Sequence, residues 1–132
     1  MPELLVARRH PGVEFILQCA HSRARHEARC WHQRYPNVSI LDDASGGTGI
    51  YNPMNFSNHF DTTPQGYAGG ITENNVVATV QQLCAMPAGR GPHDPQDVSF
   101  WIDLESGART HDTFDLDKVR RILLLTKDFV GP

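Results

Sequence analysis

The chain has 132 residues, a formal net charge of −3 and 39% hydrophobic residues. This length suits a single domain with its own core, and the acidic balance excludes the basic face of a nucleic-acid-binding protein. No apolar run approaches the about 18 residues of a membrane span. Its three cysteines lack close-paired spacing and its N-terminus lacks a signal-peptide pattern, so we expect a cytoplasmic protein with free thiols.

Predicted strands and helices alternate along the chain. Strands are expected at short apolar runs, at 13–17, 38–41, 66–68 and 98–102. Helices are expected at 2–9, 20–34, 73–85 and 115–130, with a short helix at 53–59 and a long loop at 86–97. Thr72 is a suitable N-cap for the helix at 73–85. This alternation predicts parallel βα units and an α/β fold.

Each predicted strand leads into a polar or glycine-rich segment. These segments are Gln18-Cys19, Asp42-Asp43-Ala44-Ser45-Gly46-Gly47-Thr48-Gly49, Gly69-Gly70, and Asp103-Leu104-Glu105-Ser106-Gly107. This is the pattern of a (β/α)8 TIM barrel, whose active site lies where the strands end, and a complete barrel needs about 250 residues. The sequence therefore predicts half of such a barrel, a single domain over residues 1–132 with four parallel βα units. The helix before the first strand is what a barrel cut between its fourth and fifth strands would show.

Two glycine-rich strand ends are suited to phosphate. At Gly69-Gly70 and at Ser106-Gly107 the backbone can approach an anion closely and point N–H groups at it. Many barrels hold phosphate in the loops after their last two strands, and the helix expected at 73–85 adds its positive end. The alternative is that these glycines only make tight turns. Gly46-Gly47-Thr48-Gly49 lacks the lysine of a P-loop and fits a loop over a sugar phosphate better.

Candidate catalytic residues are the carboxylates at the strand ends. Asp42 and Asp43 point to opposite sides of an extended segment, so one of them can face the mouth of the barrel as a general acid. Asp103 can orient a substrate or cap a turn. The spacing of His21, His26, Cys30 and His32 favours a polar helix face over a zinc site, and Cys19 is better read as a small buried residue than as a thiol base.

Three of these strand ends, in order and spacing, resemble the last three of phosphoribosylanthranilate isomerase, a TIM barrel of tryptophan biosynthesis. The matching segments are Leu41-Asp42 with Gly46-Gly47-Thr48-Gly49, Ala68-Gly69-Gly70-Ile71-Thr72-Glu73-Asn74-Asn75-Val76, and Asp103-Leu104-Glu105-Ser106-Gly107. The resemblance covers roughly residues 13–130, the C-terminal half of that barrel. It implies an Amadori rearrangement of an aminoaldose phosphate, without a metal or cofactor, and makes Asp42 the general acid. It implies a phosphate and substrate site at Gly46, Gly47, Gly69, Gly70, Asp103, Ser106, Gly107 and Arg109.

The chain also departs from the family's pattern. The strand that carries the family's cysteine base has no counterpart here, and Glu105 and Ala108-Arg109 replace residues usual in the last motif. Two other functions therefore stay open: a non-catalytic remnant or interaction module, and an isomerase or epimerase for another phosphorylated sugar. A half barrel also exposes sheet edges. We therefore expect either a homodimer or a separate N-terminal half to complete it.

Overall fold

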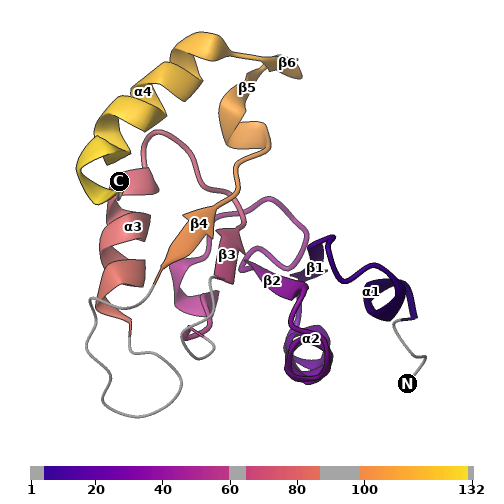
Figure 1. Cartoon of the computed structure of the whole chain (residues 1–132). Coiled ribbons are helices and arrows are strands. Elements are labelled where there is room, and N and C mark those ends of the chain that lie inside the picture. The colour runs from indigo at the N-terminus through magenta and orange to yellow at the C-terminus, as the bar shows by residue number, and fades with distance from the viewer. Residues whose placement is uncertain (1–4, 60–64, 87–98, 131–132) are drawn as a thin grey trace.

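The computed structural model describes residues 5–59, 65–86 and 99–130 of the chain. Its main sheet is parallel, with the order β1-β2-β3-β4, and consists of β1 (Phe15–Cys19), β2 (Val38–Asp43), β3 (Gln65–Ala68) and β4 (Phe100–Ile102). The helices that alternate with these strands are α1 (Leu5–Arg9), α2 (Ser22–Arg34), α3 (Val76–Ala85) and α4 (Leu116–Thr126). The chain therefore has the expected α/β fold with parallel βα units (Figure 1).

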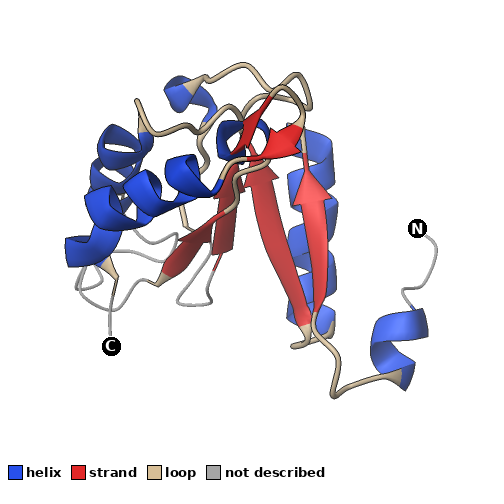
Figure 2. Ribbon diagram, turned by 90° about the horizontal axis from the view of Figure 1, so that it is seen from above, coloured by secondary structure: helices blue, strands red, loops and turns tan. Residues whose placement is uncertain are grey.

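One face of the sheet is covered by α2 and α3. Ala28 of α2 packs with Cys19 and Ile40, and residues of α3 such as Val80 and Leu83 pack with Tyr67 of β3. Figures 1 and 2 show α2 beneath β1 and β2, and α3 beside β3 and β4. The alternation of side chains along each strand puts these core residues on one side of the sheet.

A buried polar chain ties this core together. The Tyr67 hydroxyl lies 2.8 Å from Nδ1 of His59, whose Nε2 lies 2.8 Å from the Leu83 carbonyl oxygen at the end of α3. Both rings are fully buried. Burial, with a contribution from the charge of Asp42, raises the pKa of Tyr67 well above its usual range, so the neutral hydroxyl persists in the folded state.

The opposite face of the sheet carries a different set of side chains. The register pairs Ile16 with Ser39, Leu41 with Gly66, and Gly66 with Trp101, so these residues share that face. A Cβ atom on Gly66 would overlap the Trp101 ring, so the indole lies directly over the glycine. Ile16 is 54% exposed. Among the described residues, no helix packs on this face as α2 and α3 do on the other.

Most predicted elements are confirmed, with shifted ends. α3 begins at Val76 and not at residue 73 as predicted, because Thr72–Asn75 form a turn. In this turn the Asn75 side chain accepts from the Thr72 N–H and donates to the Gly70 carbonyl. The helix expected at 53–59 is a single 3₁₀ turn, Pro53–Asn55. Most of the loop at 86–97 and the start of the strand at 98–102 lie outside the described residues.

A small hairpin was not predicted. After a 3₁₀ turn at Ser106–Ala108, β5 (Arg109–Thr110) and β6 (Thr113–Phe114) pair antiparallel before α4 begins. The connecting residues His111 and Asp112 both have positive φ, the conformation of a two-residue hairpin turn that usually selects asparagine and glycine. The pair His-Asp is a weak signal for such a turn. In the described parts of the chain, no helix has the length and apolar character needed to cross a bilayer.

Candidate functional site

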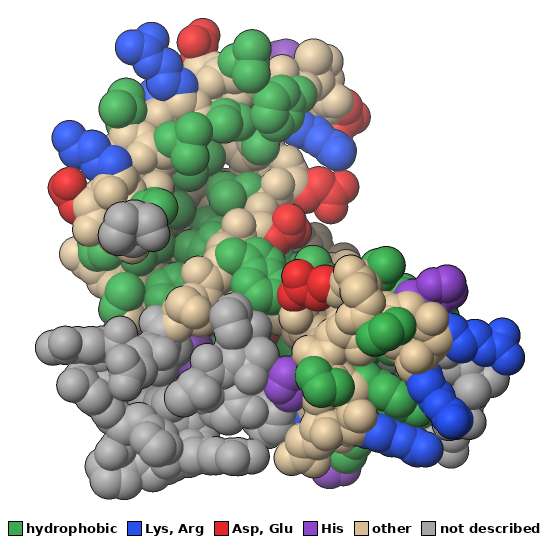
Figure 3. All heavy atoms as spheres, viewed as in Figure 1, with side chains coloured by type: hydrophobic (Ala, Val, Ile, Leu, Met, Phe, Trp, Pro, Cys, Tyr) green, Lys and Arg blue, Asp and Glu red, His purple; other side chains and the backbone are tan. Residues whose placement is uncertain are grey.

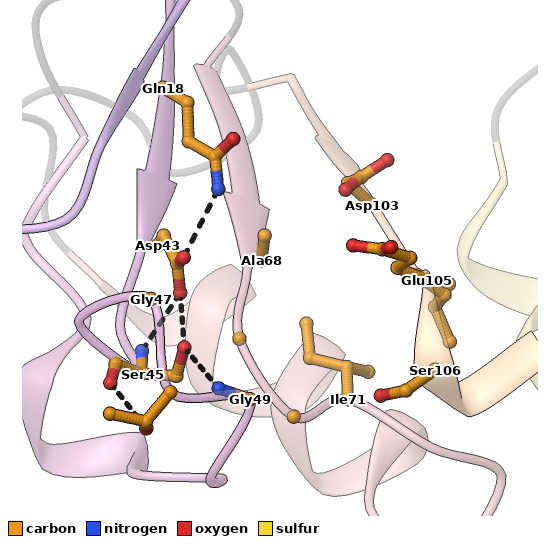
Figure 4. Close-up of a pocket in the computed structure, with 14 residues that line it drawn as sticks. Gln18, Asp43, Ser45, Gly47, Gly49, Ala68, Ile71, Asp103, Glu105 and Ser106 are labelled. Atoms are coloured by element: carbon orange, nitrogen blue, oxygen red, sulfur yellow. Dashed lines mark hydrogen bonds between the residues drawn. The ribbon is translucent and has the colours of Figure 1, made fainter.

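A pocket of about 320 Å³ opens at the carboxyl ends of the parallel strands. The loops after β2, β3 and β4 meet there, as Figure 4 shows, and Gln18 reaches it from β1. The residues that line it are Gln18, Asp43, Ser45, Gly47, Thr48, Gly49, Ala68, Gly69, Gly70, Ile71, Asp103, Leu104, Glu105 and Ser106. Parallel α/β sheets hold their ligands at this edge, so this pocket is the candidate site.

Asp43 is the carboxylate at the base of the pocket. It is 5% exposed and its Oδ1 accepts from the backbone N–H and the hydroxyl of Ser45, at 3.0 and 2.6 Å. Its Oδ2 accepts from the Gln18 side-chain amide at 3.1 Å. Ser45 in turn accepts from the Gly49 N–H, so Asp43 anchors the glycine-rich loop after β2 and holds Gln18 at the neighbouring strand end (Figure 4).

Asp42, the expected general acid, does not line this pocket. It lies on the helix-covered side of the sheet, fully buried, where its Oδ1 is 2.6 Å from Nε of Arg25 in α2. Its Oδ2 accepts from the backbone N–H and the hydroxyl of Ser57. Asp42 therefore joins β2 to α2 and to the segment that follows the glycine-rich loop. The strand register explains why Asp43, and not Asp42, lines the pocket. Asp42 pairs with buried Tyr67, whereas Asp43 pairs with Ala68, which lines the pocket.

Gly69 and Gly70 are in positive φ, at +114° and +68°. A Cβ atom on Gly69 would lie 2.6 Å from the Ser45 nitrogen and 2.8 Å from Oδ1 of Asp43, and one on Gly70 would overlap the backbone of Tyr51. These glycines therefore let the loops after β2 and β3 pack against each other and form the wall of the pocket. Close packing explains their presence without any ligand.

The same wall presents hydrogen-bond donors. Within the described part of the chain, the backbone N–H groups of Gly69, Gly70 and Ile71 donate to no other group. Ser106, whose hydroxyl also faces the pocket, lies opposite them in the loop after β4 (Figure 4). Unpaired backbone N–H groups of successive loop residues are a usual means by which a protein holds an anion.

The pocket also carries negative charge. Asp103 and Glu105 are exposed and face it from the β4 side (Figure 4). Arg109 lies outside the lining, with its Nη2 3.5 Å from Oε1 of Glu105. Among the described lining residues, none is lysine or arginine. Any anionic group bound by these residues therefore depends on backbone N–H groups and on neutral side-chain donors such as Ser106.

Of the residues predicted from the sequence, the pocket brings together Gly47, Gly69, Gly70, Asp103 and Ser106. Gly46 and Gly107 are not part of the lining. A Cβ on Gly107 would overlap the Ile71 carbonyl, so Gly107 joins the β3 and β4 loops. Gln18, Ser45 and Glu105 also line the pocket; the sequence placed them in the strand-end segments without assigning them a role in the site. The alternation along the strands was the available signal for Asp43, since one of two adjacent aspartates had to face the pocket.

The pocket includes neither Cys19, considered as a thiol base, nor the histidines and cysteine of residues 21–32, considered as a zinc site. Cys19 is 1% exposed, as expected of a small buried residue, and burial together with the charge of Asp42 raises the pKa of its thiol. Cys30 and His26 face each other at 3.9 Å on exposed turns of α2. Within the described ranges, three or more His, Cys, Asp or Glu side chains do not gather in a way that could hold a metal ion.

No protein-family model, curated protein or solved structure matches this chain.

Proposed function

We propose that this chain forms the C-terminal half of a (β/α)8 barrel, with β1 to β4 as its strands five to eight, and that it binds a phosphorylated sugar at their carboxyl ends. The parallel order β1-β2-β3-β4 and the alternating helices support the half-barrel architecture. The resemblance of the strand ends to those of phosphoribosylanthranilate isomerase supports the class of ligand.

One observation carries the proposal: three successive strand-end loops meet in a single pocket with free backbone N–H groups on one wall and a buried carboxylate at the base. In this arrangement the phosphate is held by the N–H groups of Gly69, Gly70 and Ile71. The sugar hydroxyls then extend toward Asp43 and the Gln18 amide. Hydroxyl groups suit this region because they can donate to carboxylates.

Chemistry at this site is centred on Asp43 instead of Asp42. An Amadori-type isomerisation needs one group that protonates the leaving ring oxygen and another that removes a proton from the adjacent carbon. In this proposal the protonated form of Asp43 performs the first task, and the carboxylates of Asp103 and Glu105 across the pocket perform the second. Their exposure leaves them solvated, whereas Asp43 is shielded from water.

A non-catalytic module is the competing function, and one observation favours it. Both oxygens of Asp43 accept hydrogen bonds from groups of the chain itself, so anchoring the loop is a sufficient role for this residue. The two functions differ in whether the native chain binds a sugar phosphate.

Thermal unfolding distinguishes the sugar-phosphate-binding protein from the non-catalytic module. It is measured with a reduced analogue of the aminoketose phosphate, with the unphosphorylated form of this analogue and with inorganic phosphate. Binding to the native state alone raises the midpoint by mass action, by the equivalent of about 2.7 kcal/mol at a hundred times Kd. We expect a shift with the phosphorylated analogue and a smaller one with phosphate alone. Replacing Ser106, which is exposed, with alanine removes a hydroxyl donor that faces the pocket and should reduce the shift. Asp112→Asn, in the distant β5–β6 turn, is the matched surface control. A cooperative transition that none of these compounds moves would favour the non-catalytic module.

A further inference from the structure

Among the described residues, β1 and β4 are the edge strands of the main sheet and have no further strand beside them. The N–H of Asp103 donates to Tyr67 of β3, and the N–H of Phe15 donates to Asn37 beside β2. Because backbone groups alternate in direction along a strand, those of Ile102 and Ile16 point away from the sheet. Rows of unpaired backbone groups of this kind form hydrogen bonds with another strand when one is available.

An apolar groove of about 630 Å³ runs along the free edge of β4. Phe100, Trp101 and Ile102 line it although they alternate between the two faces of β4, so the groove follows the edge of the strand. α3 forms one wall, and the end of α4 with the following turn forms the other, through Leu123, Phe129 and Val130. These three side chains are 43 to 70% exposed, and Figure 3 shows apolar atoms continuing over this region.

The other edge of the molecule carries a matching surface. Val13 and Ile16 are exposed along β1, and Val6 is exposed on α1, which lies beyond β1 in both Figures 1 and 2. The charged residues near the two strand ends differ. Exposed Arg23, which pairs with Glu27, follows the carboxyl end of β1, whereas Asp103 and Glu105, the latter paired with Arg109, follow that of β4. In Figure 3 basic side chains gather around α1 and α2.

We propose that the occupant of the groove is a second copy of this chain, whose β1 extends β4 in parallel. A two-fold rotation about the axis of the strands pairs both free edges at once and leaves none exposed. Two sheets of four strands then close into the eight-stranded barrel. This inference rests on the half-barrel architecture of the proposed function, and does not depend on its ligand.

Closing the barrel with a second copy also adds residues to the pocket. All strands remain parallel, so both pockets open at the same end of the barrel. Gln18 of the second copy lies near the end of β1, the strand next to β4, and comes to lie on the side of the pocket formed by Asp103. Each site is then completed by its neighbour. α1 of the second copy enters together with its β1 and packs against the exposed leucines of α4.

The oligomeric state tests this directly, by analytical ultracentrifugation over a range of concentrations. We expect a reversible dimer for the native chain. Ile16→Lys on the β1 edge and Leu123→Lys in the groove each introduce an unpaired charge at an exposed position, and each should raise the dimer Kd at least about tenfold. Ile50→Lys, at a comparably exposed isoleucine in the loop after β2, should leave it unchanged.

A mixing experiment tests whether β1 of one copy contacts the groove of the other. Ile16→Lys chains keep an intact groove and Leu123→Lys chains keep an intact β1 edge, so a mixture of the two should form a heterodimer through one native interface. A native chain that stays monomeric while unfolding cooperatively would overturn the proposal. So would a dimer that either variant leaves intact, or a mixture that does not associate. None of these results involves the sugar phosphate, so they are independent of the ligand-binding test.

Discussion

Asp42 and Asp43 are adjacent in the chain and have opposite surroundings. Asp42 is fully buried beneath the sheet with the Arg25 guanidinium and two donors of Ser57, and Asp43 lies at the base of the pocket with Ser45 and Gln18. A buried carboxylate is tolerated only when its charge and hydrogen bonds are satisfied. The more deeply buried aspartate therefore belongs to the scaffold, and its neighbour is available to a ligand.

Replacing Asp42 with alanine should be strongly destabilising, since it leaves the Arg25 guanidinium and the Ser57 N–H without their partner. Breaking a buried pair costs about 3–5 kcal/mol, and the partial exposure of Arg25 argues for the lower end. Urea unfolding measures the loss. Asp103→Ala, at an exposed position, should change the free energy of unfolding by less than about 0.5 kcal/mol. Equal effects of the two variants would contradict the structural role of Asp42.

The glycines of the site differ in what they tolerate. A Cβ on Gly69 would collide with the Ser45 nitrogen and with the Asp43 carboxylate, whereas one on Gly47 would meet nothing within 4 Å, and both residues have positive φ. Gly47→Ala should therefore cost only the left-handed backbone strain, about 1–2 kcal/mol. Gly69→Ala should cost clearly more, because the two loops must separate. Chemical unfolding of the two variants checks this, and similar losses would show that the loops can move apart freely.

At the scale of elements, the final helix is positioned by its cap and by one ion pair. Oδ1 of Asp115 accepts from the N–H groups of Asp117 and Lys118, and its Oδ2 accepts from the Thr110 hydroxyl on β5. Arg121 of α4 contacts Glu73 in the turn before α3, and this hydrogen bond lowers the pKa of Glu73. α4 is thus held to the hairpin at its start and to the β3 loop at its centre. Its leucines remain at the surface.

The cap of α4 predicts a dependence on pH. The Thr110 hydroxyl, followed by the Lys118 N–H, lowers the pKa of Asp115 below its ordinary 3.8. A carboxyl whose pKa is depressed by folding contributes stability above its unfolded value, and this contribution is lost as the pH falls through the folded value. Asp115→Ala should therefore lower the melting temperature at neutral pH. The difference from the native chain should shrink below pH 3.8.

A difference in melting temperature between the native chain and Asp115→Ala that stays constant down to the acid limit would mean that the carboxylate is not what caps the helix. Asp128→Ala, beyond the end of α4, is the control because it replaces an exposed aspartate without removing this cap.

The strands and helices followed from the sequence where local signals were strong. The apolar run before Gln18 and the helical spacing of the apolar residues after Asp115 are examples, since both signals act over a few positions. The hairpin Arg109–Phe114 was missed because its turn residues, His111 and Asp112, reach positive φ without glycine or asparagine. The choice between Asp42 and Asp43 needed the register of β2, which depends on partners far along the chain.

At the scale of the whole molecule, the helices cover one face of the sheet, and the edges of β1 and β4 remain open. Exposed apolar residues lie at both edges, in the groove beside β4 and at Ile16 of β1. Soluble monomers rarely expose large contiguous apolar patches. The proposed association through these edges would cover both features with one interface.

This interface predicts that thermal stability depends on protein concentration. A partner that binds only the folded chain stabilises it by mass action, so the melting temperature of the native chain should rise with its concentration. Ile16→Lys should remove that dependence and leave the low-concentration value unchanged, because Ile16 is more than half exposed in the single chain. A scanning-calorimetry series at several concentrations measures it. Equal dependence in both chains would contradict the role of the β1 edge.

The sequence by itself determined the α/β class, the order of the elements and the polar strand ends, because these depend on local apolar periodicity and turn chemistry. Tertiary structure decided which aspartate faces the pocket, that Gly69 and Gly70 join two loops, and that Gln18 belongs to the site. It also decided that an apolar groove follows the edge of β4. These features arise from pairing and packing between distant segments, and such contacts leave no pattern within any one stretch of the chain.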